Sequence, residues 1–234
     1  MAGKFMRGAL VEFMDTFLLP LPNVIIFQFN PETMTHTWTQ PEASGSNPLA
    51  VKGSPGESFS FTIAMDANDM IAEEGPVAEG IARLSGIYSR LAALEMLQYP
   101  VNPGGSGLLG SVSASVSVGS GGISVSASAS GVKRSIPQFQ IPTVLFVWGP
   151  GRIVPVRVTS LVITEKLYDV ALNPTHAEAQ LGLRVLTPEE LLFVTGPLAK
   201  IAKTAYSYSQ GLRQVLAVAN LANAADSIIG MLPI

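Results

Sequence analysis

The chain has no cysteine and few charged residues. Cysteine is absent from all 234 positions, and charged side chains make up only 13% of the sequence. Without thiols the chain cannot form disulfides, use a thiolate nucleophile or bind a metal through cysteine. Hydrophobic residues make up 47%, so a monomer would have little charge with which to solvate its surface. Two interpretations follow: other chains cover much of the surface, or a domain rich in small residues has an ordinary core.

Basic clusters and long apolar runs are also missing. The net charge is −3 and the longest basic run is Lys133-Arg134, so nucleic acid is not expected as a main partner. No apolar segment approaches the roughly 18 residues that span a bilayer, so membrane insertion is not expected. The N-terminus begins basic and apolar, but Glu12 and Asp15 interrupt it and no small-residue cleavage site follows. We therefore expect no signal peptide.

No motif typical of a catalytic, cofactor or metal site is present. The two histidines, His36 and His176, have no ligand or acid–base partner at a characteristic spacing. Neither a G-x-S-x-G elbow nor a phosphate-binding loop occurs. The pairs Glu73-Glu74 and Glu189-Glu190 lie near expected helix starts, where carboxylates interact favourably with the helix dipole. We predict structural histidines, no cofactor and no enzymatic activity.

The most regular feature is a Ser/Val ribbon within the charge-free stretch between Glu95 and Lys133. Residues 111–118 (SVSASVSV) and 123–130 (ISVSASAS) alternate strictly on either side of GSGG at 119–122. Folding about GSGG pairs the apolar residues across two strands: Val118 with Ile123, Val116 with Val125, Ala114 with Ala127, and Val112 with Ala129. This period of two predicts a β-hairpin that packs on its own domain or on a neighbouring subunit. A disordered Ser/Gly linker is the alternative.

Much of the remaining chain alternates as an antiparallel sheet does. We predict strands at residues 24–30, 34–40, 57–64, 143–148, 153–164 and 177–186. In the third of these, Phe59, Phe61 and Ile63 share one face. Pro155 lies inside the fifth and indicates a sheet edge or a bulge there.

Two segments have helical periodicity. One helix is expected to begin at Pro76 and to end before Pro100. Thr187 and Glu190 have the spacing of a capping box. The C-terminal part, from 196 to 229, is helical in composition, and Gly211 is expected to break or bend it. Its charges are too sparse for a free surface helix, so it should dock on the domain or on a partner.

Three motifs occur in order along the chain: VIIFQFNP at 24–31, TVLFVWG at 143–149 and YDVALNPTHAEAQLGLRVL at 168–186. This order resembles the tube-like domain of contractile injection systems, which are machines related to phage tails. It is similar in particular to the baseplate adaptor, or tube-initiator, proteins that join the inner tube to the spike. Many relatives end in a LysM module, but here a helical tail follows Thr187, so peptidoglycan binding is not predicted.

The resemblance implies an α+β fold: an antiparallel β-barrel or sandwich of the phage tail-tube type, with one packing helix, the long Ser/Val hairpin and a C-terminal helical tail. The expected parts are an N-terminal arm (1–22), a tail-tube-like domain (23–190) with the hairpin inserted at 101–135, and a helical extension (191–234). Eight residues are expected to shape the turns: Phe27, Phe29, Asn30, Pro31, Trp148, Gly149, Asn173 and Pro174. Both asparagines are expected to hydrogen-bond their own turns.

The resemblance also implies a structural function. The expected protein is a hexameric ring adaptor that joins the inner tube to the spike or baseplate and initiates tube assembly. Its implied partners are its own copies, the inner tube protein, and spike and baseplate proteins. The particle would be assembled in the cytoplasm, and its release from the cell is left open. An inner tube protomer is the nearest alternative. A monomeric β-sandwich binding module or small hydrolase, and a secreted envelope-binding protein, are alternatives of other classes.

Overall fold

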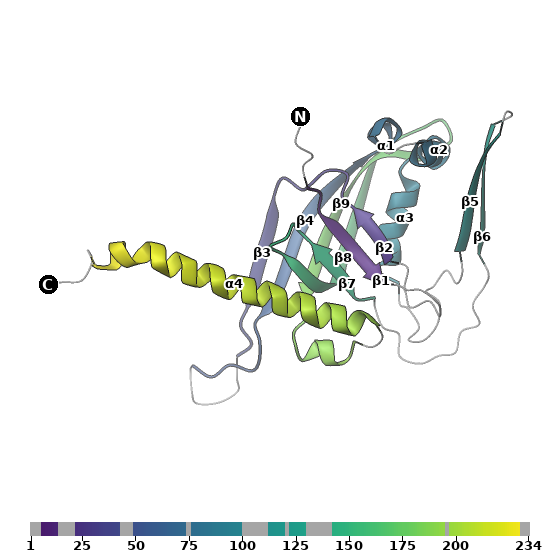
Figure 1. Cartoon of the computed structure of the whole chain (residues 1–234). Coiled ribbons are helices and arrows are strands. Elements are labelled where there is room, and N and C mark those ends of the chain that lie inside the picture. The colour runs from purple at the N-terminus through teal and green to yellow at the C-terminus, as the bar shows by residue number, and fades with distance from the viewer. Residues whose placement is uncertain are drawn as a thin grey trace.

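The computed structural model describes residues 6–13, 22–42, 49–73, 76–99, 112–119, 122–129, 142–194 and 197–229. Within these ranges the chain forms one seven-stranded antiparallel sheet, a separate two-stranded ribbon and a small number of helices (Figure 1). The predicted α+β class with an antiparallel sheet is therefore confirmed.

The strand order in the large sheet is β2-β1-β7-β8-β9-β4-β3. Its strands are β1 (Ala9–Phe13), β2 (Pro22–Ile26), β3 (Met34–Thr39), β4 (Gly56–Asp66), β7 (Val144–Val147), β8 (Ile153–Tyr168) and β9 (Pro174–Val185). The N-terminal segment that was expected to be an arm contributes β1, which pairs with both β2 and β7. Its Leu10 is fully buried, so this segment belongs to the domain.

One face of the sheet carries the core. Phe59, Phe61 and Ile63 in β4 are all buried, as their alternation predicts, while the residues between them are not. Phe146 from β7 contacts the rings of both phenylalanines, with centroid distances of 5.2 and 5.5 Å. Phe27, just after β2, reaches the same cluster, at 5.6 Å from Phe61. Aromatic side chains from distant strands can meet in this way only because the sheet curls around its apolar face.

A glutamine side chain ties the two sides of the curled sheet together. Gln28 follows β2, the first strand in the sheet order, and is 5% exposed. Its Nε2 donates to the carbonyl of Asp66 at 2.8 Å, and its Oε1 accepts from the Asp66 N–H at 2.9 Å. Asp66 ends β4, the sixth strand in the order. The Gln28 carboxamide thus takes the place of strand pairing between the segment after β2 and the end of β4. Where a barrel or sandwich was expected, the structure has one curled sheet.

The proline in β8 lies neither at a sheet edge nor at the bulge. β8 pairs with β7 on one side and β9 on the other. The Pro155 carbonyl accepts from the N–H of Leu186 at 2.9 Å, so its nitrogen also faces β9. The β8–β9 ladder begins one residue later, at Val156. Pro155 has no N–H, but because it precedes the ladder, no bond within the ladder is lost. The register shifts lie further along, the first between Val158 and Ser160 and two more between Glu165 and Tyr168.

The single helix predicted from Pro76 is two helices, α2 (Pro76–Ser85) and α3 (Tyr88–Met96), and the unpredicted α1 (Ala67–Glu73) precedes them. Gly86 separates them with a φ of +57°, a left-handed conformation that ends a helix. The break lets the N–H of Ile87 donate to the carbonyl of Pro174 at 2.9 Å. Leu84, two residues before the break, is exposed.

The capping box at Thr187 is confirmed, but it closes a short turn. Glu190 Oε2 accepts from the N–H of Thr187 at 3.0 Å, and Thr187 Oγ1 accepts from the N–H of Glu190 at 3.4 Å. The turn it closes leads into a 3₁₀ segment, Glu190–Leu192. The long C-terminal helix, α4 (Pro197–Ile229), runs without interruption through Gly211, so the predicted break there is wrong. Glycine can adopt helical angles, and the alanine-rich neighbourhood offsets its cost.

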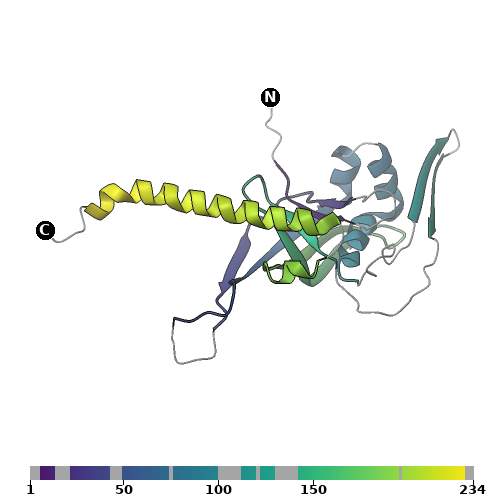
Figure 2. The same ribbon diagram turned by 60° about the horizontal axis from the view of Figure 1, so that its bottom comes forward.

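The Ser/Val ribbon forms the predicted hairpin. β5 (Val112–Gly119) and β6 (Gly122–Ala129) pair in antiparallel fashion with all four expected apolar pairs in register. The two strands make a sheet of their own. Both Figure 1 and Figure 2 show this ribbon standing apart from the seven-stranded sheet, on the side away from the end of α4.

Two glycine substitutions should have opposite effects on stability. A Cβ at residue 86 would meet the carbonyl of Pro174 and would sit on a left-handed backbone, so Gly86→Ala should lower the unfolding free energy by more than about 2 kcal/mol. A Cβ at Gly211 meets nothing within 4 Å, so Gly211→Ala should raise it by about 0.5–1 kcal/mol. Urea unfolding at one protein concentration measures both. Equal effects would contradict the assigned backbone conformations.

Candidate assembly surfaces

The outer edge of β3 is the open edge of the sheet. β3 has the sequence MTHTWT, whose threonines and tryptophan favour extended backbone. It pairs with β4 on one side, and no other strand of the described chain pairs with its outer side. Trp38 in this strand is 54% exposed. An edge of this kind presents backbone donors and acceptors to which a strand of another chain can pair.

The opposite edge, at β2, is partly covered. Helix α3 lies beside β2 (Figure 1). Arg90 from α3 donates through Nη1 to the carbonyl of Ile26 at 3.2 Å. The N–H of Phe27 extends the ladder inward, to the carbonyl of Gly8 at 2.8 Å. The two edges therefore differ, and β3 is the more accessible one.

A buried carboxylate fixes α4 to the open edge of the sheet. Glu57 in β4 is 5% exposed. Arg213 of α4 binds both of its oxygens, with Nη1 at 2.8 Å from Oε2 and Nη2 on Oε1. On the other side, His36 Nε2 lies 2.6 Å from Glu57 Oε1. The His36 ring also contacts Phe59 and Trp38, with centroids at 4.1 and 3.6 Å. One carboxylate thereby joins β3, β4 and α4.

The pKa values of this cluster shift in the direction that resists protonation. Burial alone raises the pKa of Glu57, but the hydrogen bonds and charge of Arg213, with a smaller contribution from His36, bring it below its ordinary value. Burial is the largest influence on His36 and lowers its pKa; the hydrogen bond and charge of Glu57 oppose this, the charges of Arg152 and Arg213 add to it, and the pKa lies below its ordinary value. The unfolded chain therefore binds protons more readily at both groups, so acidification from neutral pH should destabilise the fold.

Further contacts hold the first half of α4 on the β7–β8 turn. Ser209 is buried; its Oγ donates to the carbonyl of Ile153 at 2.7 Å and accepts from the Ile153 N–H at 3.3 Å. Tyr208 donates through its hydroxyl to the carbonyl of Pro150 at 2.9 Å. Ala202 and Ala205 are buried on the same side of the helix. The prediction that the tail docks on the domain is therefore correct for this half.

The turn residues of the first two motifs meet around Gly8. Phe27 lies 6.4 Å from Trp148, measured between ring centroids, and both rings contact the space a Cβ at Gly8 would fill. Asn30 does not bond its own turn as predicted. Its Oδ1 accepts from the N–H of Gly8 at 2.9 Å, and its Nδ2 donates to the carbonyl of Met6 at 2.9 Å. No sequence pattern indicated these bonds, because β1 was not expected to exist.

The other residues predicted for these turns have smaller roles. Phe29 is exposed and Pro31 is partly buried. Gly149 has a φ of +69° in the β7–β8 turn, which is the conformation that favours glycine there.

The third motif is located elsewhere, at the tip of the β8–β9 hairpin. The Asp169 carboxylate accepts from the N–H and the Nδ2 of Asn173, at 2.8 and 2.9 Å, so here the predicted bond within the turn is present. Asn173 Nδ2 also donates to the carbonyl of Leu84 at 3.2 Å. The carbonyl of Pro174 accepts from the N–H of Ile87, the residue before α3. The tip is thus held against the α2–α3 junction, while its Val170 and Leu172 are exposed.

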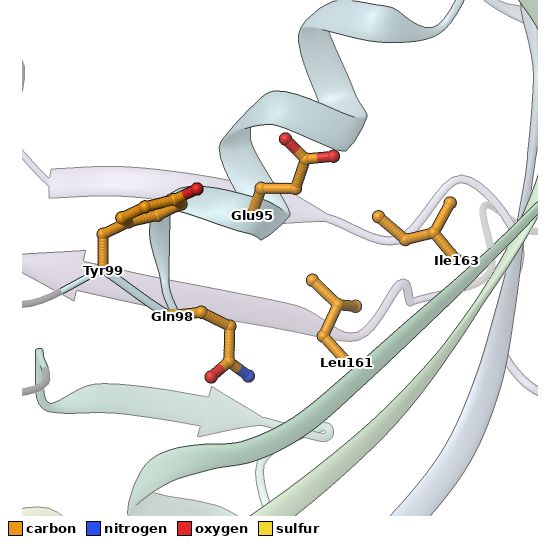
Figure 3. Close-up of a pocket in the computed structure, with 5 residues that line it drawn as sticks. All are labelled: Glu95, Gln98, Tyr99, Leu161 and Ile163. Carbon is orange, nitrogen blue, oxygen red and sulfur yellow. The ribbon is translucent and has the colours of Figure 1, made fainter.

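A shallow hollow of about 410 Å³ lies between the end of α3 and β8 (Figure 3). Its lining residues are Glu95, Gln98, Tyr99, Leu161 and Ile163. The Nε2 atom of Gln98 is buried and has no hydrogen-bond partner in the described part of the chain. The hollow's polar groups are one carboxylate, one carboxamide and one phenol hydroxyl, and the rest of the lining is aliphatic.

Within the described residues, no three His, Asp or Glu side chains cluster as a metal site would require. No helix there is both long and apolar enough to cross a membrane. Comparison of the chain with protein-family models and with curated proteins found no match.

The Glu57–Arg213 contact is the part of this surface that sequence reasoning missed. The two residues are 156 positions apart, so no local spacing links them. Glu57 was visible only as an acidic residue in an otherwise alternating strand. Arg213 was visible only as one of the few charges on the C-terminal helix.

Loss of Arg213 should destabilise the protein in a pH-dependent way. Arg213→Met should lower the unfolding free energy at pH 7 by about 2 kcal/mol, because it leaves the buried carboxylate with His36 alone. The gap to the unsubstituted protein should close as the pH falls and Glu57 is protonated, since a lowered carboxyl pKa stabilises only the ionised form. Urea unfolding at pH 7 and at decreasing pH measures this.

The matched control is Arg83→Met. Arg83 forms an exposed pair with Glu79 one helical turn away, and its loss should cost less than about 0.5 kcal/mol. An effect of Arg213→Met no larger than that of the control would show that the Glu57 contact does not hold α4 in place.

Proposed function

We propose that this protein is a structural subunit of a contractile injection system. In this proposal it forms a hexameric ring that joins the inner tube to the spike or baseplate and initiates tube assembly. It acts by binding other protein chains and catalyses no reaction.

The observation that supports this proposal best is the open β3 edge of a curled antiparallel sheet. A ring can form by cyclic repetition when one surface of a subunit binds a different surface of the next. Backbone pairing at an unoccupied edge is a strong way to make such a contact. The difference between the open β3 edge and the partly covered β2 edge suits a contact between unlike surfaces.

The Ser/Val hairpin supports the same function. Among the described strands, β5 and β6 pair only with each other, and two-stranded ribbons alone are at best marginally stable in water. A neighbouring subunit or the next ring would supply a surface on which such a ribbon can pack. The hairpin lies outside the large sheet (Figure 2), where it can reach another component without opening the domain.

The adaptor is favoured over an inner tube protomer by the C-terminal helix. α4 is 33 residues long, and its second half extends past the sheet (Figure 1). A subunit present in one ring can use such an extension for components that surround it. In a long stack of identical rings, the same projection would have to be accommodated at every level.

The first test is the mass in solution, together with a variant of the open edge. We expect the purified protein to have six times the 24.6 kDa chain mass by light scattering. Thr37→Lys places a charge in the exposed edge strand and should shift the mass toward the monomer, because lysine on an edge opposes strand addition.

The control for this variant is Ser60→Lys. Ser60 is also exposed, but it lies in β4, where it pairs with Thr35 of β3 and Gly182 of β9, so the assembled mass should be unchanged. A monomer at all concentrations, or equal effects of both variants, would contradict ring formation through the β3 edge.

Replacing residues 112–129 with Gly-Ser-Gly should separate folding from assembly. The melting temperature should be nearly unchanged, because the large sheet contains neither β5 nor β6. Binding to the inner tube protein, measured by co-sedimentation, should be lost. Val116→Ile, which keeps the alternating pattern, is the control and should still bind. Unchanged binding by the deletion variant would exclude the hairpin from the contact with the tube.

A further inference from the structure

The second half of α4 leaves the domain that holds the first half. The docked side is defined by Ala202, Ala205 and Ser209, which are all buried and are spaced by three and four residues. Beyond Arg213, every side chain from 214 to 220 is exposed. Figure 2 shows the helix continuing well past the sheet. The exposed part includes Val215 at 64% and Val218 at 68%.

An apolar line of its own runs along the projecting half. From Gly211 the sequence places apolar or small residues at steps of four, three, four, three and four: Gly211, Val215, Val218, Ala222, Ala225 and Ile229. This is the a/d spacing of a heptad repeat, which recurs every 3.5 residues.

The docked side of α4 does not remain apolar toward the C-terminus. Extending its spacing beyond Leu216 and Ala219 leads to Asn223 and Asp226, which are polar. The two lines are about 100° apart around the helix. Over residues 214–220, where Val215 and Val218 are exposed, the apolar line therefore lies on a side of α4 that its own domain does not cover.

We propose that the projecting half of α4 pairs with α4 of a second copy as a parallel coiled coil. The 3.5-residue period is the one that brings two helices together along a common seam. Asp226 is the only charged residue between 214 and 229, so nothing on this segment selects a charged partner. A parallel pair in register joins two like surfaces around a two-fold axis, so in a ring of six subunits it groups the chains as three pairs. This inference rests on the self-assembly proposed above and assigns an element and a partner to it.

The absence of cysteine makes a direct test possible. Val215→Cys and Val218→Cys each introduce one thiol on the seam. In a parallel pair in register, each thiol faces its counterpart within the Cα separation of about 4.4–6.8 Å that a disulfide requires. Ala217→Cys is the matched control, because residue 217 is also exposed but points away from the seam. Under mild oxidation, both seam variants should form covalent dimers about tenfold faster than the control. Non-reducing gels measure this.

Light scattering on the same samples separates the two proposals. An assembled protein in which the seam variants cross-link no faster than Ala217→Cys would overturn the helix pairing and leave the ring intact. Cross-linking at Val218 without Val215 would overturn the parallel register. A protein that stays monomeric and does not cross-link would overturn both the self-assembly and the helix pairing.

Discussion

Closure of one curled sheet over a single apolar face is the constraint on which the rest of this structure depends. The rings of Phe27, Phe61 and Phe146 come from the first, sixth and third strands in the sheet order or from residues beside them. They can pack together only if the two sides of the sheet approach each other. Once they do, the backbone N–H and carbonyl of Asp66 face the Gln28 side chain and not another strand. The carboxamide of Gln28 supplies one donor and one acceptor to them, which avoids the cost of leaving buried polar groups unpaired.

The curled sheet also positions the proposed assembly surfaces. With its concave face filled by the core, the sheet can still add strand pairs at its edges. The β3 edge is kept open while α4 crosses close to it, fixed by the contact between Arg213 and Glu57. This contact orders the edge strand through His36 and directs the second half of the helix away from the domain. The hairpin and the projecting helix lie on opposite sides in Figure 1, as the proposed contacts with two different neighbours require.

Parts of the fold and of the candidate surfaces could be read from local patterns. The alternation in β4 predicted the buried face, because residues two apart in a strand share a side. The mirror symmetry of the Ser/Val ribbon predicted its register, since only one pairing aligns all the apolar residues. The Thr187–Glu190 spacing predicted a reciprocal pair of hydrogen bonds, although not the shortness of the turn that they close. In each case the determining interactions lie within a few residues of each other or across one tight turn.

Other features were decided only by tertiary structure, because the interactions behind them join distant residues. The N-terminal segment reads as an arm, yet it becomes a strand because β2 and β7 offer ladders on both sides. The helix expected after Pro76 breaks at Gly86, because Pro174 comes close enough to exclude a Cβ and to accept a hydrogen bond from Ile87. Glu57 and Arg213, 156 residues apart, have no sequence signal for their pairing. The sequence by itself determined which residues alternate, which are apolar and where tight turns form. The curled sheet determined which of these segments meet, because contacts over long separations depend on the path of the whole chain.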